Sequence, residues 1–231
     1  HKKGVHVDPA DRPVEREHGI GGIIKQTISP HDLEGHRLFH HNFAQHGRFY
    51  LPAQQIPSAQ RYTLRVNDQP TVEVDYTSQQ PRILYNLCGL DAPTDCYEQK
   101  NRYSRSELKA AMLRALNCES RSDAVKSLMR GTGENHAYCV RLMEVLERQH
   151  EAISKHFFKG KGRHLMKLDS SIASLVINKM TRKGIPMIPI HDSFIVEQKY
   201  AEELIDAMFT AYQIVLGNRY WSPLKIVGKE W

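Results

Sequence analysis

The fold is decided by residues 64–88, which read LRVNDQPTVEVDYTSQQPRILYNLC. Apolar and polar residues alternate on both sides of a turn-forming pair, residues 67–68, and this pattern predicts a β-hairpin. The second strand of the hairpin ends on a carboxylate, Asp75. Residues 78–88 carry apolar residues at helical spacing, with Pro81 in the first turn. The chain is therefore expected to pass from this strand into a helix.

A second hairpin is predicted at residues 187–197, MIPIHDSFIVE, where two short apolar runs meet at His191 and Asp192. A carboxylate in a sheet-forming segment is costly unless it is paired or bound to a cation. Asp75 and Asp192 can each be explained as a residue that caps a turn. On adjacent strands they would instead form an oxygen-ligand site for Mg²⁺, and both explanations stay open at this point.

The part of the chain between the two hairpins has a helical pattern. Ser104 and Glu107 form a capping box, which predicts a helix through about residue 117. A second long helix is predicted over roughly residues 134–158, and it is expected to end at the glycine-containing loop that follows.

Further elements are expected before and after the second hairpin. Asp169 is expected to cap a helix that Gly184 and Pro186 end. A final amphipathic helix around residues 204–212 and a short strand at residues 224–227 complete the order. This mixture of hairpins and helices predicts an α+β fold with an antiparallel sheet.

The N-terminal part differs in character. Residues 1–47 are polar and weakly periodic, and their eight histidines match no ligand spacing typical of a metal site. Residues 48–62 contain two prolines and are expected to form an extended connector. The four cysteines of the chain are scattered without a CxxC pair, which favours reduced structural thiols.

Charge is unevenly distributed along the chain, whose formal net charge is +6. Residues 100–199 hold 19 Lys and Arg against 10 Asp and Glu. This surplus indicates a polyanionic partner such as a nucleic acid, although a solvated basic face explains it equally well. No apolar run approaches the roughly 18 residues of a membrane span, and the globular composition argues against disorder, collagen and coiled coil. The chain is expected to be soluble and intracellular.

Two segments resemble known polymerase motifs. Residues 74–84, VDYTSQQPRIL, are similar to motif A of family A DNA polymerases, DYSQIELRI. Residues 190–193, IHDS, are similar to motif C, which is HDE in those enzymes and HDS in the related phage-type single-subunit RNA polymerases. The motif A positions in register without a gap are Asp75, Tyr76, Gln80 and Arg82.

Three further matches lie in the order that the family has. Residues 46–50, HGRFY, and 54–57, QQIP, resemble the TGR and LQNIP segments that precede motif A. Arg105 and Lys109 have the four-residue spacing of the motif B helix, which brings both side chains to one face. Residues 227–231, VGKEW, resemble the C-terminal strand and tryptophan of the family.

The resemblance implies a palm domain with a two-metal site. Asp75 and Asp192, with the backbone carbonyl of Tyr76, would bind two Mg²⁺ ions, with Mn²⁺ as an alternative. A primer 3′-hydroxyl would attack the α-phosphate of a dNTP, with Lys109 and His191 completing the implied catalytic set. The residues implied to bind the nucleotide are Tyr76, Gln80, Arg105, Lys109, Leu113 and Asn117.

The same resemblance implies contacts to the primer-template. Arg48 would contact the duplex near the primer terminus, and His191 would support the primer strand. Asp169 lies where family members contact the template-primer, although a helix cap explains it as well. The full set implied to bind nucleic acid is Arg48, Gln54, Gln55, Arg82, Asp169 and His191.

Three positions depart from the family pattern. Gln80 stands where the DNA polymerases have Glu and the RNA polymerases have Gly, and its bulk would crowd a ribose 2′-hydroxyl, which favours deoxynucleotides. Asn117 stands where both groups have an aromatic residue, and Leu113 replaces a larger one. Base stacking and sugar discrimination in the fingers therefore stay open.

The implied organisation is a polar extension over residues 1–47 and a palm over residues 48–231, with reduced fingers inserted at about residues 100–165. No counterpart of a full thumb or an exonuclease domain is recognised. The implied partners are a DNA primer-template and dNTPs, without a membrane, in the cytoplasm of a bacterial or phage-infected cell. An N-terminal domain outside this chain or accessory replication proteins would complete the assembly.

Two other functions compete with a DNA polymerase. The first is an RNA polymerase or primase, which HDS at motif C and the missing motif B aromatic favour. The second is a degenerate palm that binds nucleic acid without catalysis. Retention of Asp75 and Asp192 argues against the second.

Overall fold

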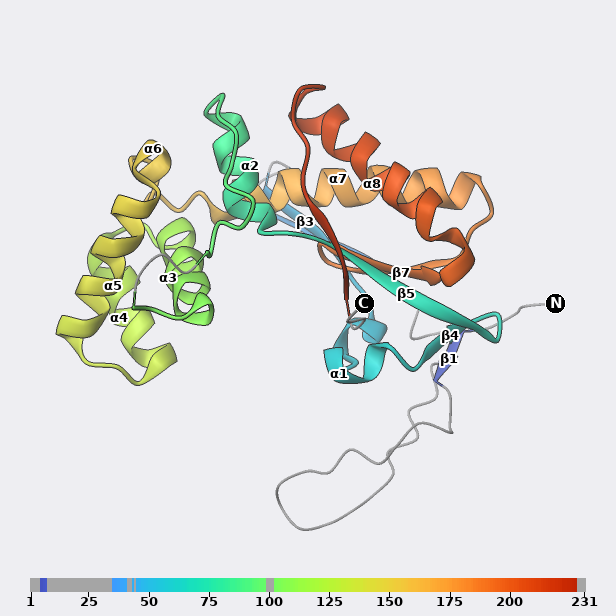
Figure 1. The fold of residues 1–231 in the computed structure, drawn as a ribbon, viewed down its shortest axis with the longest axis horizontal. Helices are drawn as coiled ribbons and strands as arrows, with labels where there is room; N and C mark the ends of the chain where they lie inside the picture. Colours follow the sequence, from blue (N-terminus) through green and yellow to red (C-terminus); the bar gives the residue numbers. More distant parts are fainter. Residues whose placement is uncertain (1–4, 8–34, 41–42, 44, 99–101, 228–231) are drawn as a thin grey trace, which may run out of the picture.

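The computed structural model of this chain describes residues 5–7, 35–40, 43, 45–98 and 102–227. Figure 1 shows two lobes, a twisted sheet backed by long helices and a compact bundle of shorter helices. Mixed helices and antiparallel strands confirm the predicted α+β class. The expected polar extension over residues 1–47 lies mostly outside the described residues, as do residues 228–231.

The main sheet is antiparallel throughout, and strand β5 lies at its centre. β5 pairs with β7 on one side and with β8 on the other, while its first residues pair with β4. The strands in spatial order are β1 (Val5–Val7), β4 (Leu64–Val66), β5 (Gln69–Tyr76), β7 (Ser193–Glu197) and β6 (Met187–Ile190), with β8 (Leu224–Val227) also on β5.

Both predicted hairpins and the terminal strand are confirmed. Asn67 and Asp68 connect β4 to β5 with φ angles of 52° and 64°. Tight two-residue turns require this left-handed conformation, which Asn and Asp tolerate better than most residues. In the second hairpin, His191 has a φ of 56° between β6 and β7. The two turns fix the register that brings the hairpins side by side.

A separate two-stranded sheet precedes the main one. It consists of β2 (His36–His40) and β3 (Gln45–Tyr50), and it is followed by a 3-10 turn (Pro52–Gln55) and α1 (Ser58–Arg61). The predicted extended connector over residues 48–62 is therefore wrong. Leu51, Ala53 and Ile56 are buried with residues of β4, β6 and β7, and this apolar burial folds the segment despite its prolines.

Three helices support the main sheet. They are α2 (Gln79–Leu87), which begins just after β5 as predicted with Pro81 in its first turn, α7 (Gly162–Arg182) and α8 (Ala201–Leu216). Figure 1 shows α7 and α8 together on one face. The expected cap at Asp169 is wrong, because α7 begins seven residues earlier, at Gly162. Asp169 therefore lies in the middle part of α7, among the residues of the helix that are buried in the protein.

The second lobe contains α3 (Arg105–Asn117), α4 (Arg121–Thr132), α5 (His136–Gln149) and α6 (Glu151–Ser154). The capping box at Ser104 and Glu107 is confirmed, with both reciprocal hydrogen bonds present. The long helix predicted over residues 134–158 is wrong, because the chain breaks at His150 and residues 155–158 are not helical. The buried His150 ring bonds the Tyr85 hydroxyl and the Cys96 carbonyl, each at 2.9 Å.

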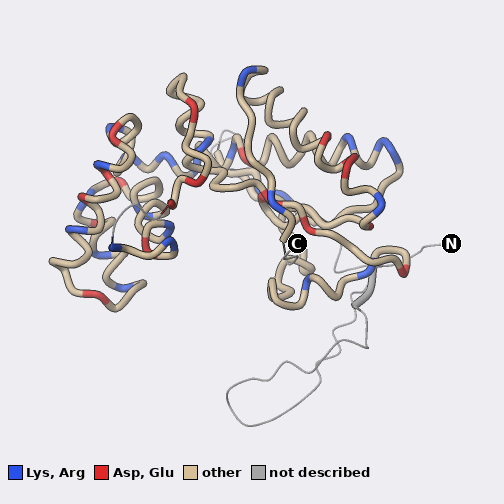
Figure 2. Tube along the Cα trace, in the orientation of Figure 1, with Lys and Arg blue, Asp and Glu red and all other residues tan. Residues whose placement is uncertain are grey.

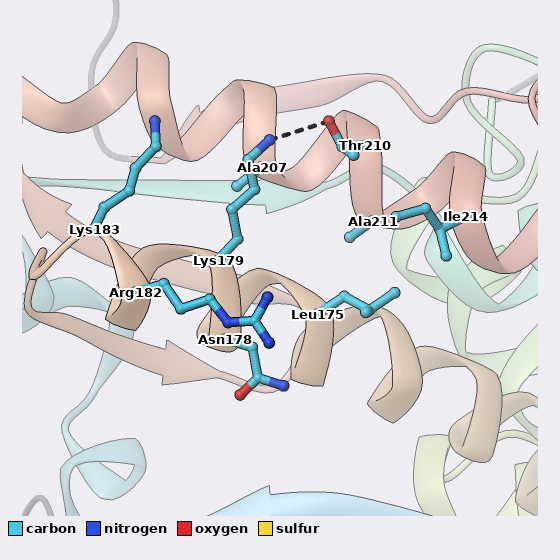
Figure 3. Close-up of a pocket in the computed structure, with 9 residues that line it drawn as sticks. All are labelled: Leu175, Asn178, Lys179, Arg182, Lys183, Ala207, Thr210, Ala211 and Ile214. Atoms are coloured by element: carbon cyan, nitrogen blue, oxygen red, sulfur yellow. Dashed lines mark hydrogen bonds between the residues drawn. The ribbon is translucent and has the colours of Figure 1, made fainter.

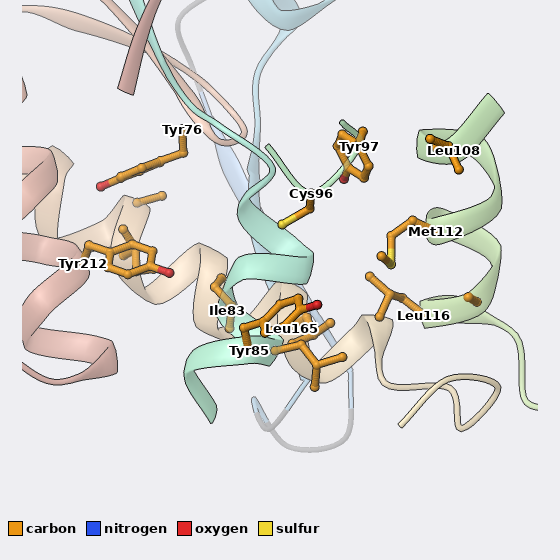
Figure 4. Close-up of a cluster of buried hydrophobic side chains, with 14 of the residues drawn as sticks. Tyr76, Ile83, Tyr85, Cys96, Tyr97, Leu108, Met112, Leu116, Leu165 and Tyr212 are labelled. Carbon is orange, nitrogen blue, oxygen red and sulfur yellow. The ribbon is translucent and has the colours of Figure 1, made fainter. Parts of the chain in front are cut away.

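One hydrophobic core runs through both lobes. Figure 4 shows Tyr76 and Tyr212 near the sheet, Ile83 and Leu165 at the junction, and Leu108 on α3 in the helical lobe. All five side chains are buried. Since interiors pack at crystal-like density, this continuous core fixes the position of α3 relative to the strands that carry the two aspartates.

The basic surplus is shared between the helical lobe and α7, which carries four Lys and Arg against one Asp. Lys and Arg recur along α3, α4 and α5 in Figure 2. Some have acidic partners, such as Arg121, which lies 2.9 Å from Glu147. Among the described residues, no helix has the length and apolar character needed to cross a membrane.

Candidate active site

The two hairpins bring Asp75 and Asp192 together. Asp75 is opposite Ser193 in the β5–β7 register, and Asp192 directly precedes Ser193. The Tyr76 amide donates to the Asp192 carbonyl at 3.3 Å. Burial of Asp75 and the negative charge of Asp192 raise the pKa of Asp75 to about 6. Two carboxylates placed in this way form a site that attracts cations.

The two aspartates lie in a cavity of about 440 Å³ between the lobes. The sheet contributes Asp75, Asp192 and Lys225, and β3 contributes Arg48. The start of α2 and one face of α3 form the remaining walls. The lining residues from these helices and their flanks include Ser78, Gln79, Gln80, Tyr97, Arg105, Lys109 and Leu113.

The wall from α3 is cationic. Arg105 pairs with Asp95 at 2.6 Å, and Asp95 also accepts hydrogen bonds from the Ser78 hydroxyl and the Tyr97 amide. Burial would raise the pKa of Asp95, but these donors hold it below its ordinary value. Lys109 follows one turn later on the same face and is exposed. Arg105 and Lys109 therefore both face the cavity, as their spacing predicts.

Arg48 is held at the edge of the cavity by Asp169. Its Nε and Nη2 atoms lie 2.8 and 2.6 Å from the Asp169 carboxylate. Asp169 is 2% exposed, and burial raises its pKa to about 6. Asp169 itself does not line the cavity, so the structure places it behind Arg48.

His191 lies beside the cavity in the β6–β7 turn. Its ring meets Tyr50 edge-on at 5.9 Å between centroids. Burial lowers its pKa, and the nearby positive charge of Arg48 lowers it further. The imidazole is therefore neutral near pH 7.

Tyr76 contributes its backbone to the site and its ring to the core. The Tyr76 hydroxyl donates to the Met208 carbonyl on α8 at 2.6 Å, and Figure 4 shows the ring beside Tyr212. The backbone at Tyr76 lies next to Asp192, whose carbonyl accepts from the Tyr76 amide. The ring is 2% exposed and is not positioned to stack on a base.

Four other predicted site residues do not line the cavity. Arg82 is buried and donates to the carbonyls of Pro93 and Thr94, which stabilises the loop before α3. Gln54 donates to the carbonyls of Phe49 and Pro189, so it connects two strands. Gln55 is exposed, and Asn117 is half-buried and donates from its side-chain amide to the Leu113 carbonyl. Neither residue lines the cavity.

Two residues of the cavity region were not predicted. Lys225 lies opposite Asp75 in the β5–β8 register, with Nζ 2.9 Å from the Asp75 carboxylate. Asp95 positions Arg105. Neither has a motif around it, and Lys225 is recognised only once the pairing of β8 with β5 is known.

The donor set of the cavity fits Mg²⁺. Protein-bound Mg²⁺ uses one or two carboxylates and completes its shell with water and substrate phosphates. Asp75 and Asp192 supply two such carboxylates, and the Tyr76 backbone lies beside Asp192. Within the described part of the chain, no cluster of three or more His, Cys, Asp or Glu offers a closed metal site.

A second hollow of about 380 Å³ lies between α7 and α8 (Figure 3). Lys179 spans it and pairs with Asp206 at 2.7 Å, with a further bond to Thr210. It contains no residue of the predicted site. The cavity with Asp75 and Asp192 is therefore the candidate active site.

Comparisons with known proteins found similarity in structure only. No family model and no curated protein matches this chain. Among solved structures, the chain is similar to the POL domain of Pol1 from M. smegmatis in complex with DNA primer-template and dNTP. The TM-score is 0.49 at 12% identity, over 78% of this chain and 45% of that chain. The chain thus spans less than half the length of that structure.

Proposed function

We propose that this chain is a template-dependent nucleotidyltransferase of the family A DNA polymerase type, which extends a primer with dNTPs. The observation that carries the proposal is the meeting of Asp75 and Asp192 with Arg105 and Lys109 around one cavity. Two carboxylates from the sheet and two cations from α3 around one cavity suit a cation-bound triphosphate, whose charge must be neutralised during transfer.

The acidic and basic residues of the cavity have different roles in this proposal. Asp75 and Asp192 would hold Mg²⁺ ions, which when bound neutralise phosphate charge and activate the attacking hydroxyl. Arg105 and Lys109 bind the triphosphate from the α3 side, with Asp95 restraining Arg105. Positioning of this kind removes much of the entropic cost of bringing two reactants together.

The nucleic-acid side of the site is Arg48. Its guanidinium is partly exposed at the cavity edge and fixed by a buried carboxylate, so its orientation is set before a strand binds. The neutral His191 supports the primer strand next to Asp192. In this proposal the sheet lobe acts as the palm, and the helices between residues 100 and 165 act as reduced fingers.

Sugar preference is assigned to Gln80. Its side chain lies at the cavity on the first turn of α2. A side chain of this size near the sugar disfavours a 2′-hydroxyl, so dNTPs are the proposed substrates.

The proposal is tested by primer extension on a short primed DNA template with Mg²⁺ and either dNTPs or NTPs. Asp75→Asn and Asp192→Asn are expected to lower extension at least about a hundredfold, because each removes a carboxylate that would hold the Mg²⁺ ions. The matched control is Asp206→Asn, an exposed aspartate on α8 outside the cavity. Unchanged extension by both site variants would refute the assignment, and extension with NTPs alone would support an RNA polymerase or primase instead.

A further inference from the structure

The cation in direct contact with Asp75 comes from the last described strand. Lys225 on β8 is directly opposite Asp75 on β5, and its Nζ lies 2.9 Å from Asp75 Oδ2. Direct cross-strand neighbours of opposite charge attract each other. The Asp192 side chain, by contrast, has no hydrogen bond or ion pair within the described residues, and its charge acts on Arg48 from a greater distance. One carboxylate of the pair is therefore occupied by an ammonium, and the other is open.

An ammonium held against one oxygen of Asp75 disfavours a divalent cation at the same carboxylate. Both cations would lie close together at one carboxylate, and the repulsion between two cations grows as their separation falls. Asp75 is 20% exposed, so water screens this repulsion only weakly. A divalent cation bound at Asp75 is therefore expected to displace Lys225 from its present position.

Lys225 is free to leave. Its side chain is 53% exposed and carries four rotatable bonds, so little packing holds it over Asp75. It also lines the same cavity as Arg105 and Lys109. A triphosphate in this cavity offers phosphate oxygens as new partners for the released ammonium.

We propose that Lys225 occupies the cation position at Asp75 in the substrate-free protein and is displaced when a divalent cation binds. Lys225 thus lowers the affinity of the free site for divalent cations, and it transfers to the phosphates of an incoming nucleotide. The transfer of Lys225 to a nucleotide rests on the proposed function. The competition between Lys225 and a divalent cation at Asp75 rests on the geometry alone.

The test measures Mn²⁺ binding to the full chain without nucleotide, by the loss of the free Mn²⁺ signal in electron paramagnetic resonance. Lys225→Met is expected to tighten binding about twofold to fivefold, the range for loss of a partly exposed ion pair. Lys225→Arg keeps a cation opposite Asp75 and is expected to bind Mn²⁺ like the parent. Lys109→Met removes the same charge from the same cavity without releasing Asp75, so it is expected to have a clearly smaller effect. Circular dichroism and melting curves establish that each variant is folded.

Several results would overturn the inference. These are unchanged or weaker binding in Lys225→Met, equal tightening in Lys109→Met, which would indicate a net-charge effect only, and no measurable Mn²⁺ binding in any variant. Because the competition acts through the Asp75 carboxylate, tightening by Lys225→Met that persists when Asp75→Asn is also present would contradict it as well. Tightening in Lys225→Met without any primer extension would leave the inference intact and refute the proposed function.

Discussion

The Arg48–Asp169 ion pair allows a quantitative test of the site's construction. We consider Arg48→Met, Asp169→Asn and the double variant. Two unit charges about 4 Å apart attract by about 4 kcal/mol at an effective dielectric constant near 20, and desolvation offsets part of this gain. Removal of one partner from a buried pair costs about 3–5 kcal/mol, because the other charge is left buried and unpaired.

The exposure of the two partners sets the values for this protein. Asp169 is 2% exposed, whereas the Arg48 side chain is 19% exposed and can recover some hydration. Arg48→Met is therefore expected to cost about 3 kcal/mol, and Asp169→Asn about 2 kcal/mol. The double variant leaves no unpaired charge, so it is expected to be about 2 kcal/mol more stable than the sum of the single effects predicts.

The assay is urea denaturation followed by circular dichroism at pH 7.5, with free energies of unfolding combined in a double-mutant cycle. A coupling energy below about 0.5 kcal/mol would refute the conclusion that Asp169 holds Arg48. Such a result would favour the other role expected for Asp169, a direct contact with nucleic acid.

The cycle also has an expected pH dependence. Burial raises the pKa of Asp169 to about 6 in the folded protein, against an ordinary value of 3.8. The folded state thus binds this proton more tightly than the unfolded state, so the penalty of the buried charge is absent below pH 3.8 and fully present above pH 6. Without Arg48 the pKa rises further. The destabilisation by Arg48→Met is therefore expected to be smaller at pH 5 than at pH 7.5 in the same denaturation assay.

Three further substitutions test the framework around the site, each by urea denaturation. Ser104→Ala removes the cap of α3 and is expected to cost about 1 kcal/mol; no loss would contradict the capping box. Gly47→Ala is expected to cost at least about 2 kcal/mol, because φ is +88° and a Cβ would lie 2.7 Å from the Phe39 ring; a neutral effect would contradict this close packing. His150→Ala is expected to cost about 3 kcal/mol or more through a cavity and the lost bonds to Tyr85 and Cys96, and a loss below about 1 kcal/mol would contradict the buried network.

Local signals in the sequence predicted most elements of the fold. The alternation around residues 64–75, the turn at residues 191–192 and the Ser104 capping box each depend on neighbouring residues, so they could be recognised directly. Asp169 was misassigned because an aspartate before an apolar run is typical of a helix cap. Its true partner, Arg48, is 121 residues away in the chain.

In the candidate site, too, features that depend on neighbouring residues could be predicted, and features that depend on distant residues could not. Arg105 and Lys109 could be predicted together because one helix carries both. The break at His150 depends on Tyr85 and Cys96, and the position of Lys225 depends on strand pairing. These contacts form between segments that are far apart in the sequence, so no local periodicity predicts them. Roles taken over from motif similarity, such as that of Arg82, do not reveal whether the side chain is buried.

The topology also bears on how the protein folds. The helices α3, α4 and α5 are consecutive, so their mutual contacts are local. In contrast, β5 pairs with β7 and β8, which lie more than a hundred residues further along the chain. Local contacts form faster, because closing a long loop costs entropy before any contact compensates for it. The helical bundle is thus expected to form early and the sheet late. Because the cavity needs both, the candidate active site is expected to be completed in the last step of folding, when β7 and β8 pair with β5 on either side of Asp75.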